Sequence, residues 1–253
     1  DLKERGPVSL RQALAGSLNT PAVEMLYLVG VGPVIDFAEE LGYSTFEDRS
    51  RFGLSLVLGG GEVLPIDHAA AFAAIAREGE YRAPVAVLKV TAPDGQVLEE
   101  WKETEPRRVM DQQTARLVND VMTDNNARAY VFGQSNSLTL PDRPVAAKTG
   151  TTNNNKDAWT AGYTPNLVTI VWVGNSRGEE MKRGADGSII AAPIWQAYMK
   201  RALKGMPVER FTAPAPAQTT KPALLGKAFE QTVRVNKLTG KRATASTPPD
   251  LVE

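Results

Sequence analysis

The sequence contains no cysteine and a single histidine, and these two shortages exclude several kinds of site. Without cysteine the chain has no disulfide bond, no thiolate nucleophile and no thiolate metal ligand. One histidine cannot form a histidine-rich metal site, and a Ser-His-Asp triad would depend on His68 alone. Because His68 follows Asp67 at the start of an alanine-rich run, we interpret it as a residue in the first turn of a helix. We expect no metal site and no cofactor, and a serine nucleophile here would use a lysine as its base.

The chain also lacks an excess of charge and a long apolar run. It has 29 basic and 29 acidic side chains, so electrostatics gives no reason to expect nucleic acid or an anionic membrane surface as the main partner. No stretch approaches the ~20 apolar residues that a membrane-spanning helix needs, and no signal peptide opens the chain. We therefore expect any membrane anchor to belong to an absent N-terminal segment.

The chain does contain enough apolar sequence for a sizeable core, since 42% of its 253 residues are hydrophobic. The spacing of apolar residues, with capping and stop signals, predicts helices over residues 9–16, 21–29, 32–42, 66–78, 111–124 and 189–203. Alternating and β-branched stretches predict a projecting hairpin over 85–98 and antiparallel strands over 145–151, 158–163 and 167–173. The fold class is therefore mixed α/β, or α+β.

Three further expectations concern single segments. Residues 54–62 contain three consecutive glycines and are expected to form a flexible loop. Residues 125–143 are expected to be polar and irregular. Phe37 is expected on the buried face of the helix over 32–42.

Prolines separate the end of the chain from the rest. Pro207, Pro214, Pro216 and Pro222 mark a linker over residues 206–225. The expected organisation is thus a main domain over residues 1–205, this linker, and a short C-terminal segment over 226–253. In the last segment, residues 232–235 and 244–245 are expected to form short strands.

The most informative motif is Lys148-Thr149-Gly150, on the strand predicted over 145–151. K-T-G is one of three elements that serine acyl-transfer enzymes acting on D-alanyl peptides and β-lactams place around a reactive serine. Lys148 provides a cation for a substrate carboxylate, Thr149 and Thr151 add hydroxyls, and Gly150 allows close approach of a substrate backbone. Such a strand can also pair with an extended peptide. The plain alternative is a solvated lysine near the end of a strand.

A second element of that set, S-x-N, is present as Ser17-Leu18-Asn19. The Ser17 hydroxyl can pass a proton to or from a leaving amine, and the Asn19 amide can hydrogen-bond a substrate backbone. Both residue types also favour turns and caps, so a purely structural role in a turn between helices stays open. The third element is missing, because no serine is followed three positions later by a lysine. We therefore expect the nucleophile to lie outside this chain, which is read as a fragment.

Longer blocks around both motifs resemble the transpeptidase domain of class A (bifunctional) penicillin-binding proteins. One block is residues 5–23, which surrounds Ser17-Leu18-Asn19. The other is residues 148–175, in which K-T-G is followed by Lys156-Asp157-Ala158-Trp159 and by Val171-Trp172-Val173-Gly174-Asn175. Residues 58–65, 79–84 and 236–240 are also similar to that family, so the resemblance covers most of residues 5–205.

The resemblance implies a fold like that of penicillin-binding proteins and serine β-lactamases, incomplete at its N-terminus, with an antiparallel sheet packed between helices. It implies D,D-transpeptidation, in which a serine attacks the penultimate D-alanine of a stem peptide, D-alanine leaves, and an amine of a neighbouring stem resolves the acyl-enzyme. Carried over, the catalytic residues are Ser17, Asn19 and Lys148, with Lys148 orienting Ser17 and the substrate carboxylate. Thr149, Gly150 and Thr151 form the substrate-binding strand, and the Thr151 N–H gives half of an oxyanion hole.

The implied partners are peptidoglycan stem peptides, β-lactam antibiotics and the missing upstream segment of the same protein, and nucleic acid is not among them. The implied location is the extracytoplasmic face of the bacterial inner membrane. This chain alone is expected to be inactive toward penicillin, and apolar surface that the missing helix would cover is expected to be exposed.

Several alternatives stay open. A monofunctional transpeptidase, a D,D-carboxypeptidase or a β-lactamase shares the three-element site. From another class, a noncatalytic module that binds peptidoglycan peptides or β-lactams, or regulates their processing, would keep the peptide-binding wall without the nucleophile. The presence of S-x-x-K upstream favours the transpeptidase, and its absence favours the binding module.

Overall fold

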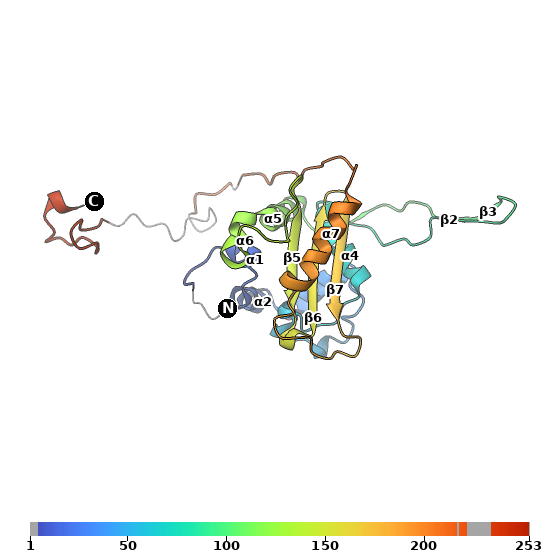
Figure 1. The fold of residues 1–253 in the computed structure, drawn as a ribbon, viewed down its shortest axis with the longest axis horizontal. Helices are drawn as coiled ribbons and strands as arrows, with labels where there is room; N and C mark the ends of the chain where they lie inside the picture. The colour runs from blue at the N-terminus through green and yellow to red at the C-terminus, as the bar shows by residue number, and fades with distance from the viewer. Residues whose placement is uncertain (1–4, 217, 222–233, 253) are drawn as a thin grey trace. The chain divides into compact units, whose positions relative to one another are not determined.

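The computed structural model describes residues 5–216, 218–221 and 234–252 of the chain (Figure 1). The chain divides into two compact units. One is Leu10–Ala215, which contains the central sheet and the helices that pack on it. The other is made of the terminal segments Asp1–Ser9 and Pro216–Glu253. The candidate site lies entirely in the first unit.

Three short helices open the larger unit: α1 (Leu10–Ala15), α2 (Asn19–Val29) and α3 (Val31–Glu40). They confirm the three predicted helices to within two residues at each end. Gly30 separates α2 from α3, since its φ of 92° suits a residue without a Cβ. The expectation for Phe37 is wrong, because 37% of this side chain is exposed. Ile35 is the buried residue of α3, and Phe37 points ~200° away from it around the helix axis.

Two 3-10 helices, η1 (Arg49–Arg51) and η2 (Leu54–Leu58), precede the long helix α4 (Pro65–Ala76). The flexible loop expected over 54–62 is therefore wrong in its first half. Apolar residues of η2 pack near α2, and Gly59 ends η2 in the left-handed conformation. Helix α4 begins with a proline, whose missing N–H is harmless in the first turn, and it confirms the predicted helix over 66–78.

Two small antiparallel pairs follow. Strand β1 (Glu80–Tyr81) pairs with β4 (Arg107–Arg108), and β2 (Lys89–Thr91) pairs with β3 (Val97–Glu100). The second pair confirms the hairpin predicted over 85–98. Every residue of β2 and β3 is exposed, and Figure 1 shows the hairpin extending from the rest of the Leu10–Ala215 unit.

Helices α5 (Gln112–Thr123) and α6 (Asn125–Phe132) come next. Helix α5 was predicted, with Ala115 and Met122 buried on its apolar face. Helix α6 contradicts the irregular segment expected over 125–143. It forms because the Asp124 carboxylate accepts a hydrogen bond from the Ala127 N–H at 2.8 Å, which caps the first turn, and Gly133 ends the helix with a φ of 77°.

The central sheet has three antiparallel strands in the order β5-β6-β7: β5 (Ala146–Thr151), β6 (Asp157–Thr164) and β7 (Leu167–Gly174). All three were predicted. In the register, Lys148 lies opposite Ala161, and Gly150 lies opposite Trp159. Among the described strands β5 has a neighbour on one side only, so its outer edge is a sheet edge.

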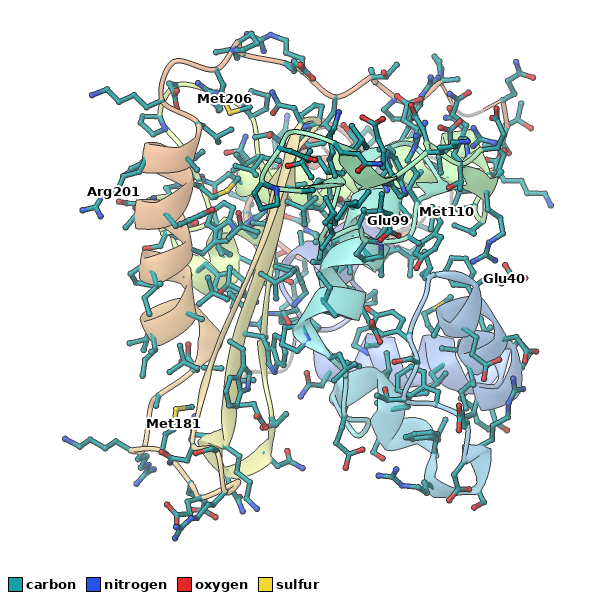
Figure 2. All side chains as sticks on the ribbon, turned by 90° about the vertical axis from the view of Figure 1, so that its right-hand side faces the viewer. Glu40, Glu99, Met110, Met181, Arg201 and Met206 are labelled. Atoms are coloured by element: carbon teal, nitrogen blue, oxygen red, sulfur yellow. The ribbon has the colours of Figure 1, made fainter. Side chains whose placement is uncertain are left out.

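Helices cover both faces of this sheet, as Figure 2 shows. On one face α7 (Ala192–Ala202) buries Trp195 and Met199, and the Trp195 ring lies where a Cβ at Gly162 would be, at 2.3 Å. On the other face Tyr163 and Ala146 pack with Met122 of α5 and Ala76 of α4. The predicted antiparallel sheet between helices is confirmed, and so is the helix over 189–203, although its first residues belong to a π-helical turn, η4 (Gly187–Ala191).

In the described part of the terminal unit, Val235 bridges Arg242 and Asn236 bridges Val252. The strand expected over 244–245 is wrong, since those residues form a turn closed by a hydrogen bond from the Thr247 N–H to the Thr244 carbonyl. Of the strand expected over 232–235, residues 232 and 233 lie outside the described residues. Within the described residues no single helix is long and apolar enough to cross a membrane, while α2 and α3 taken together meet that test of length and composition across a 93° bend.

Candidate active site

Ser17 occupies an unusual backbone position at the end of α1. Its φ is 58°, in the left-handed region that normally favours glycine. The Ser17 N–H donates to Leu14 O at 3.2 Å and the Leu18 N–H to Ala13 O at 2.9 Å, which is the hydrogen-bond pattern of a helix ending in a left-handed residue. A serine held in this conformation is mildly strained, and such residues are concentrated at functional sites.

Helix α1, which leads into the turn that carries Ser17, is held by contacts with two other helices. Arg11 of α1 bonds the carboxylates of Asp120 and Asp124, which lie at the end of α5. The Tyr130 hydroxyl of α6 donates to Gln12 O at 2.8 Å. These contacts hold the end of α1 beside α5 and α6, and thereby set the position of Ser17.

Lys148 and Ser17 are in direct contact, although 131 positions separate them in the sequence. The Lys148 ammonium donates to Ser17 Oγ at 2.5 Å and to the Thr149 carbonyl at 2.7 Å. Burial lowers the pKa of Lys148 to about 8, and the charge of Arg128 adds to this effect. A lysine with this pKa can exchange a proton with a neighbouring hydroxyl near neutral pH.

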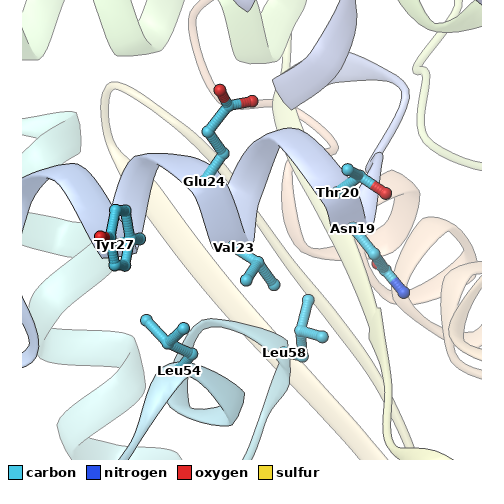
Figure 3. A pocket seen from close by; sticks show the side chains of 7 residues that line it. All are labelled: Asn19, Thr20, Val23, Glu24, Tyr27, Leu54 and Leu58. Atoms are coloured by element: carbon cyan, nitrogen blue, oxygen red, sulfur yellow. The ribbon is translucent and has the colours of Figure 1, made fainter.

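Asn19 begins α2, two residues after Ser17, and lines a surface hollow of about 610 Å³. Figure 3 shows Asn19 and Thr20 at one end of the hollow and Tyr27 at the other. Leu54 and Leu58 of η2 form the opposite wall. Apart from Asn19, Thr20 and Glu24 the lining is apolar or aromatic, and the Tyr27 side chain is 73% exposed.

Thr149, Gly150 and Thr151 continue β5 beyond Lys148. Thr149 and Gly150 are half-buried and Thr151 is exposed. Thr151 Oγ1 accepts a hydrogen bond from the Gly187 N–H at 3.0 Å. The structure therefore brings Ser17 and Lys148 into contact, places Asn19 on the same turn, and arranges the three predicted binding residues along the adjoining strand edge.

Sequence reasoning missed Gly187, which lies against this strand. A Cβ at Gly187 would lie 2.5 Å from Gly150 O and 2.4 Å from Trp159 O, so only glycine fits. Its carbonyl accepts from Thr160 Oγ1 at 3.1 Å, and its N–H bonds Thr151. Gly187 thus fixes Gly150 and Thr151 from the face that α7 covers. The signal in the sequence is a glycine just before a helix, which is too common to identify a site.

Sequence reasoning also missed Arg128, because it lies on the unpredicted helix α6. Its side chain is 2% exposed. The guanidinium donates to Ala147 O at 3.0 Å and to Met122 O. It therefore contacts the backbone of β5 at the residue just before Lys148.

His68 lies in the first turn of α4, as predicted. Its contacts are with residues other than Ser17 and Lys148. Its Nδ1 is 2.6 Å from the Tyr43 hydroxyl, and its ring packs against Trp159. Burial lowers the pKa of His68 to about 4. In the described residues no group of three or more histidine and carboxylate side chains is placed to hold a metal ion.

Comparison with known proteins gives a family match over most of the chain. A family model described as "Transpeptidase: Penicillin binding protein transpeptidase domain" matches residues 1–200. The sequence is 37% identical over 215 residues to "Penicillin-binding protein 1A" of Aquifex aeolicus, covering 85% of this chain and 28% of the relative. It is 34% identical to the protein of the same name from Neisseria cinerea, covering 81% of this chain and 26% of the relative. The chain thus spans little more than a quarter of the length of these relatives.

Solved structures give the same match. The penicillin-binding protein PonA1 from Mycobacterium tuberculosis aligns with a TM-score of 0.74 at 31% identity, over 87% of this chain and 65% of that one. PonA1 in complex with penicillin V aligns with a TM-score of 0.73 at 33% identity, over 85% and 61%. Penicillin-Binding Protein 1A from Haemophilus influenzae, at 23% identity, shares the fold with a TM-score of 0.71 over 97% and 40%.

Proposed function

Since this chain belongs to the penicillin-binding protein transpeptidase family, in which it matches class A members, we propose that it forms one wall of a D,D-transpeptidase site. The reaction is serine acyl transfer on peptidoglycan stem peptides, and the same site takes β-lactams. The nucleophilic serine and its lysine belong to an S-x-x-K segment outside these 253 residues, because no serine of this chain has a lysine three positions later.

The contact between Lys148 Nζ and Ser17 Oγ carries this proposal. A solvated lysine at a strand end would not contact a serine on the turn after a different helix, whereas Lys148 Nζ is hydrogen-bonded to Ser17 Oγ. Because the donor is an ammonium, the hydrogen bond from Lys148 Nζ to Ser17 Oγ is charge-assisted. The contact joins the S-x-N and K-T-G motifs, whose proximity the sequence indicated only through the family resemblance.

The pair is suited to proton transfer at the leaving group. During acylation the bond between the penultimate D-alanine carbonyl and the leaving nitrogen breaks, and that nitrogen needs a proton. The Ser17 hydroxyl supplies this proton and takes up another from Lys148. In the second half of the reaction the acceptor amine loses a proton, which returns by the same route. Asn19, on the same turn, donates its amide to the substrate backbone.

Recognition of the substrate carboxylate falls to Lys148, Thr149 and Thr151. One lone pair of Thr151 Oγ1 is occupied by the Gly187 N–H, so the hydroxyl proton of Thr151 is left to donate to a carboxylate. Arg128 and Lys148 add positive charge on the same side of the strand. A free α-carboxylate, as in D-alanine or penicillin, fits this set of donors.

The edge of β5 is suited to an extended peptide. The carbonyls of Ala147 and Thr149 both accept bonds from side chains, so the backbone groups of alternate residues point away from β6. By this alternation the N–H of Thr151 also faces the open edge. There it can form half of an oxyanion hole and pair with the peptide that brings the scissile carbonyl.

The hollow beside Asn19 suits the absent segment. It is lined mainly by apolar side chains and lies next to the turn that bears Ser17, where the nucleophile must come. We assign it to the S-x-x-K segment of the same protein. Membership in a family of cell-wall synthases supports a reaction outside the cytoplasm, and we propose the outer face of the inner membrane, with any anchor in an N-terminal segment.

The test is gel labelling with a fluorescent penicillin, applied to this chain and to the protein extended upstream through the next S-x-x-K. We expect labelling of the extended protein alone, reduced at least ~100-fold in rate by Lys148→Ala and by Ser17→Ala. The control Lys156→Ala, a lysine in the turn after β5, should label at the normal rate. Failure of both proteins to label favours a noncatalytic binding module, and labelling of the short chain means that the nucleophile lies within it.

A further inference from the structure

Arg128 is the one charged residue in the fully buried set of the described chain. Its guanidinium donates to two backbone carbonyls, Ala147 O at 3.0 Å and Met122 O. Its Nε–H finds no acceptor among the described residues. A buried donor without a partner is unfavourable, so its presence calls for an explanation.

Among the described residues, no carboxylate is ion-paired with this cation. In the described part of the chain neither Arg128 nor Lys148 forms an ion pair with a carboxylate. The carboxylate that acts on Arg128 is Asp124, one helix turn away, and it is already bonded to Arg11 at 3.0 Å and to the Ala127 N–H. If position 128 served packing only, an apolar side chain of similar size would fill it as well, without the unfavourable burial of a charge.

The position of Arg128 links it to the site. It bonds the carbonyl of Ala147, the residue immediately before Lys148, on the edge of β5 that faces away from β6. Lys148 bonds the next carbonyl on that edge, Thr149 O, together with Ser17 Oγ. Two side chains from different elements thus hydrogen-bond alternate carbonyls of one strand and bring two positive charges to the same strand edge.

We propose that Arg128 is a positioning residue of the acyl-transfer site, which fixes β5 just before Lys148 and adds a second positive charge near the Lys148 ammonium, so that this ammonium readily gives a proton to Ser17. The inference rests on the function proposed above and adds to it a residue that touches neither substrate nor nucleophile.

The charges around Lys148 support this role. The neighbouring groups are the neutral Ser17 hydroxyl from the turn after α1, the Thr149 carbonyl from β5, and the Arg128 cation from α6. Burial and the repulsion from Arg128 act in the same direction and lower the pKa of Lys148. In the reaction Lys148 loses a proton to Ser17 while Ser17 gives its own to the leaving nitrogen, and it recovers one from the acceptor amine, so no proton is gained or lost overall.

The test is an NMR titration of Lys148 in the chain with isotope-labelled lysine side chains, with the signal assigned as the one missing from Lys148→Arg. In the natural sequence we expect a midpoint of about 8. In Arg128→Met the midpoint should rise by ~1 unit, because the repelling charge is gone while the volume is kept. The matched control is Arg116→Met, which removes an arginine of α5 that is paired with Glu78, and it should leave the midpoint unchanged.

The outcomes separate this inference from the proposed function, because the titration needs no reaction with penicillin. An unchanged midpoint in folded Arg128→Met overturns the inference, and so does an ordinary lysine midpoint of ~10.4 in the natural sequence. Should Arg128→Met not fold, Arg128→Lys decides. It keeps the charge but not the two-pronged contact, so the midpoint should stay low while amide hydrogen exchange at Lys148 and Thr149 becomes at least ~10-fold faster. Unchanged exchange in Arg128→Lys also overturns the inference.

Discussion

At the scale of single residues, the protonation states near the site follow from burial. His68 is held neutral between Tyr43, whose hydroxyl lies 2.6 Å from Nδ1, and the rings of Phe72 and Trp159. Burial also raises the pKa of Tyr43, so its hydroxyl keeps its proton and can donate to the imidazole. Because Trp159 lies opposite Gly150 in the sheet, His68 supports the K-T-G strand through packing rather than through chemistry.

This burial predicts a pH dependence of stability. The pKa of His68 is lowered from 6.5 to about 4 in the folded chain. Above pH 6.5 the imidazole is neutral in both states. As the pH falls from 6.5 to 4, only the unfolded chain takes up the proton, so the free energy of unfolding falls by at most about 3 kcal/mol.

Urea unfolding at pH values from 7.5 to 4, on the natural chain and on His68→Gln, checks this expectation. Glutamine keeps a neutral polar group beside Tyr43 and does not titrate, so its stability should fall less steeply in that interval. The carboxylates titrate in both proteins, so their contribution cancels when the two free energies of unfolding are subtracted. Parallel curves would show that His68 is not buried as described.

At the scale of helices and strands, one acidic residue links three elements that position Ser17 and Arg128. Asp124 ends α5, caps α6 through the Ala127 N–H at 2.8 Å, and pairs with Arg11 of α1 at 3.0 Å. The loss of this side chain therefore removes a cap and an ion pair together.

We expect Asp124→Ala to lower the free energy of unfolding by ~1.5 kcal/mol, about 1 kcal/mol for the cap and ~0.5 kcal/mol for the partly exposed ion pair. Asp111→Ala is the matched control, because Asp111 caps α5 through the Thr114 N–H at 2.9 Å and has no such pair. Chemical denaturation should show a smaller loss there. When Arg11 is also replaced by alanine, Asp124→Ala should cost no more stability than Asp111→Ala. Equal losses for Asp124→Ala and Asp111→Ala in the chain that keeps Arg11 would contradict the role of the ion pair.

The sequence predicted those elements whose signal is local. Alternating apolar residues and β-branched runs sufficed for β5, β6 and β7, and apolar residues at helical spacing sufficed for α5. Helix α6 was missed because its polar composition outweighed two weak signals, the capping Asp124 and the terminating Gly133. Arg128 was lost with it. Ser17 and Lys148 could be named from motifs, but their contact is long-range, and no local pattern contains it.

At the scale of the whole molecule, the division into two units predicts that the main domain ends at Ala215. The sequence places the boundary at residue 205. In the structure the Phe211 ring packs edge-on against the buried Tyr163 ring with centroids 5.7 Å apart, and Gln113 of α5 hydrogen-bonds the backbone of Ala215 at both N–H and carbonyl.

A chain ending at Ala215 should therefore unfold thermally within ~2 °C of the full chain, while one ending at residue 205 should unfold ~4–8 °C lower, because it loses the Phe211 contact. Phe211→Ala in the full chain serves as the control and should reproduce most of the difference. Equal melting temperatures for the two shortened chains would place the boundary at 205, and a large loss in the chain ending at 215 would mean that the terminal segments contribute to the fold.

Among the described strands β5 pairs on one side only, and its unpaired edge has a consequence beyond catalysis. A strand edge that must stay open for a peptide is also a template on which another copy of the protein could add a strand and begin to aggregate. In this chain Arg128 and Lys148 occupy the carbonyls of Ala147 and Thr149, so part of the edge is already hydrogen-bonded and carries positive charge. An identical strand approaching it would bring its own Lys148 against these cations. Like charges on the two copies would therefore oppose such pairing, whereas in the proposed function the same charges would attract a peptide that ends in a carboxylate.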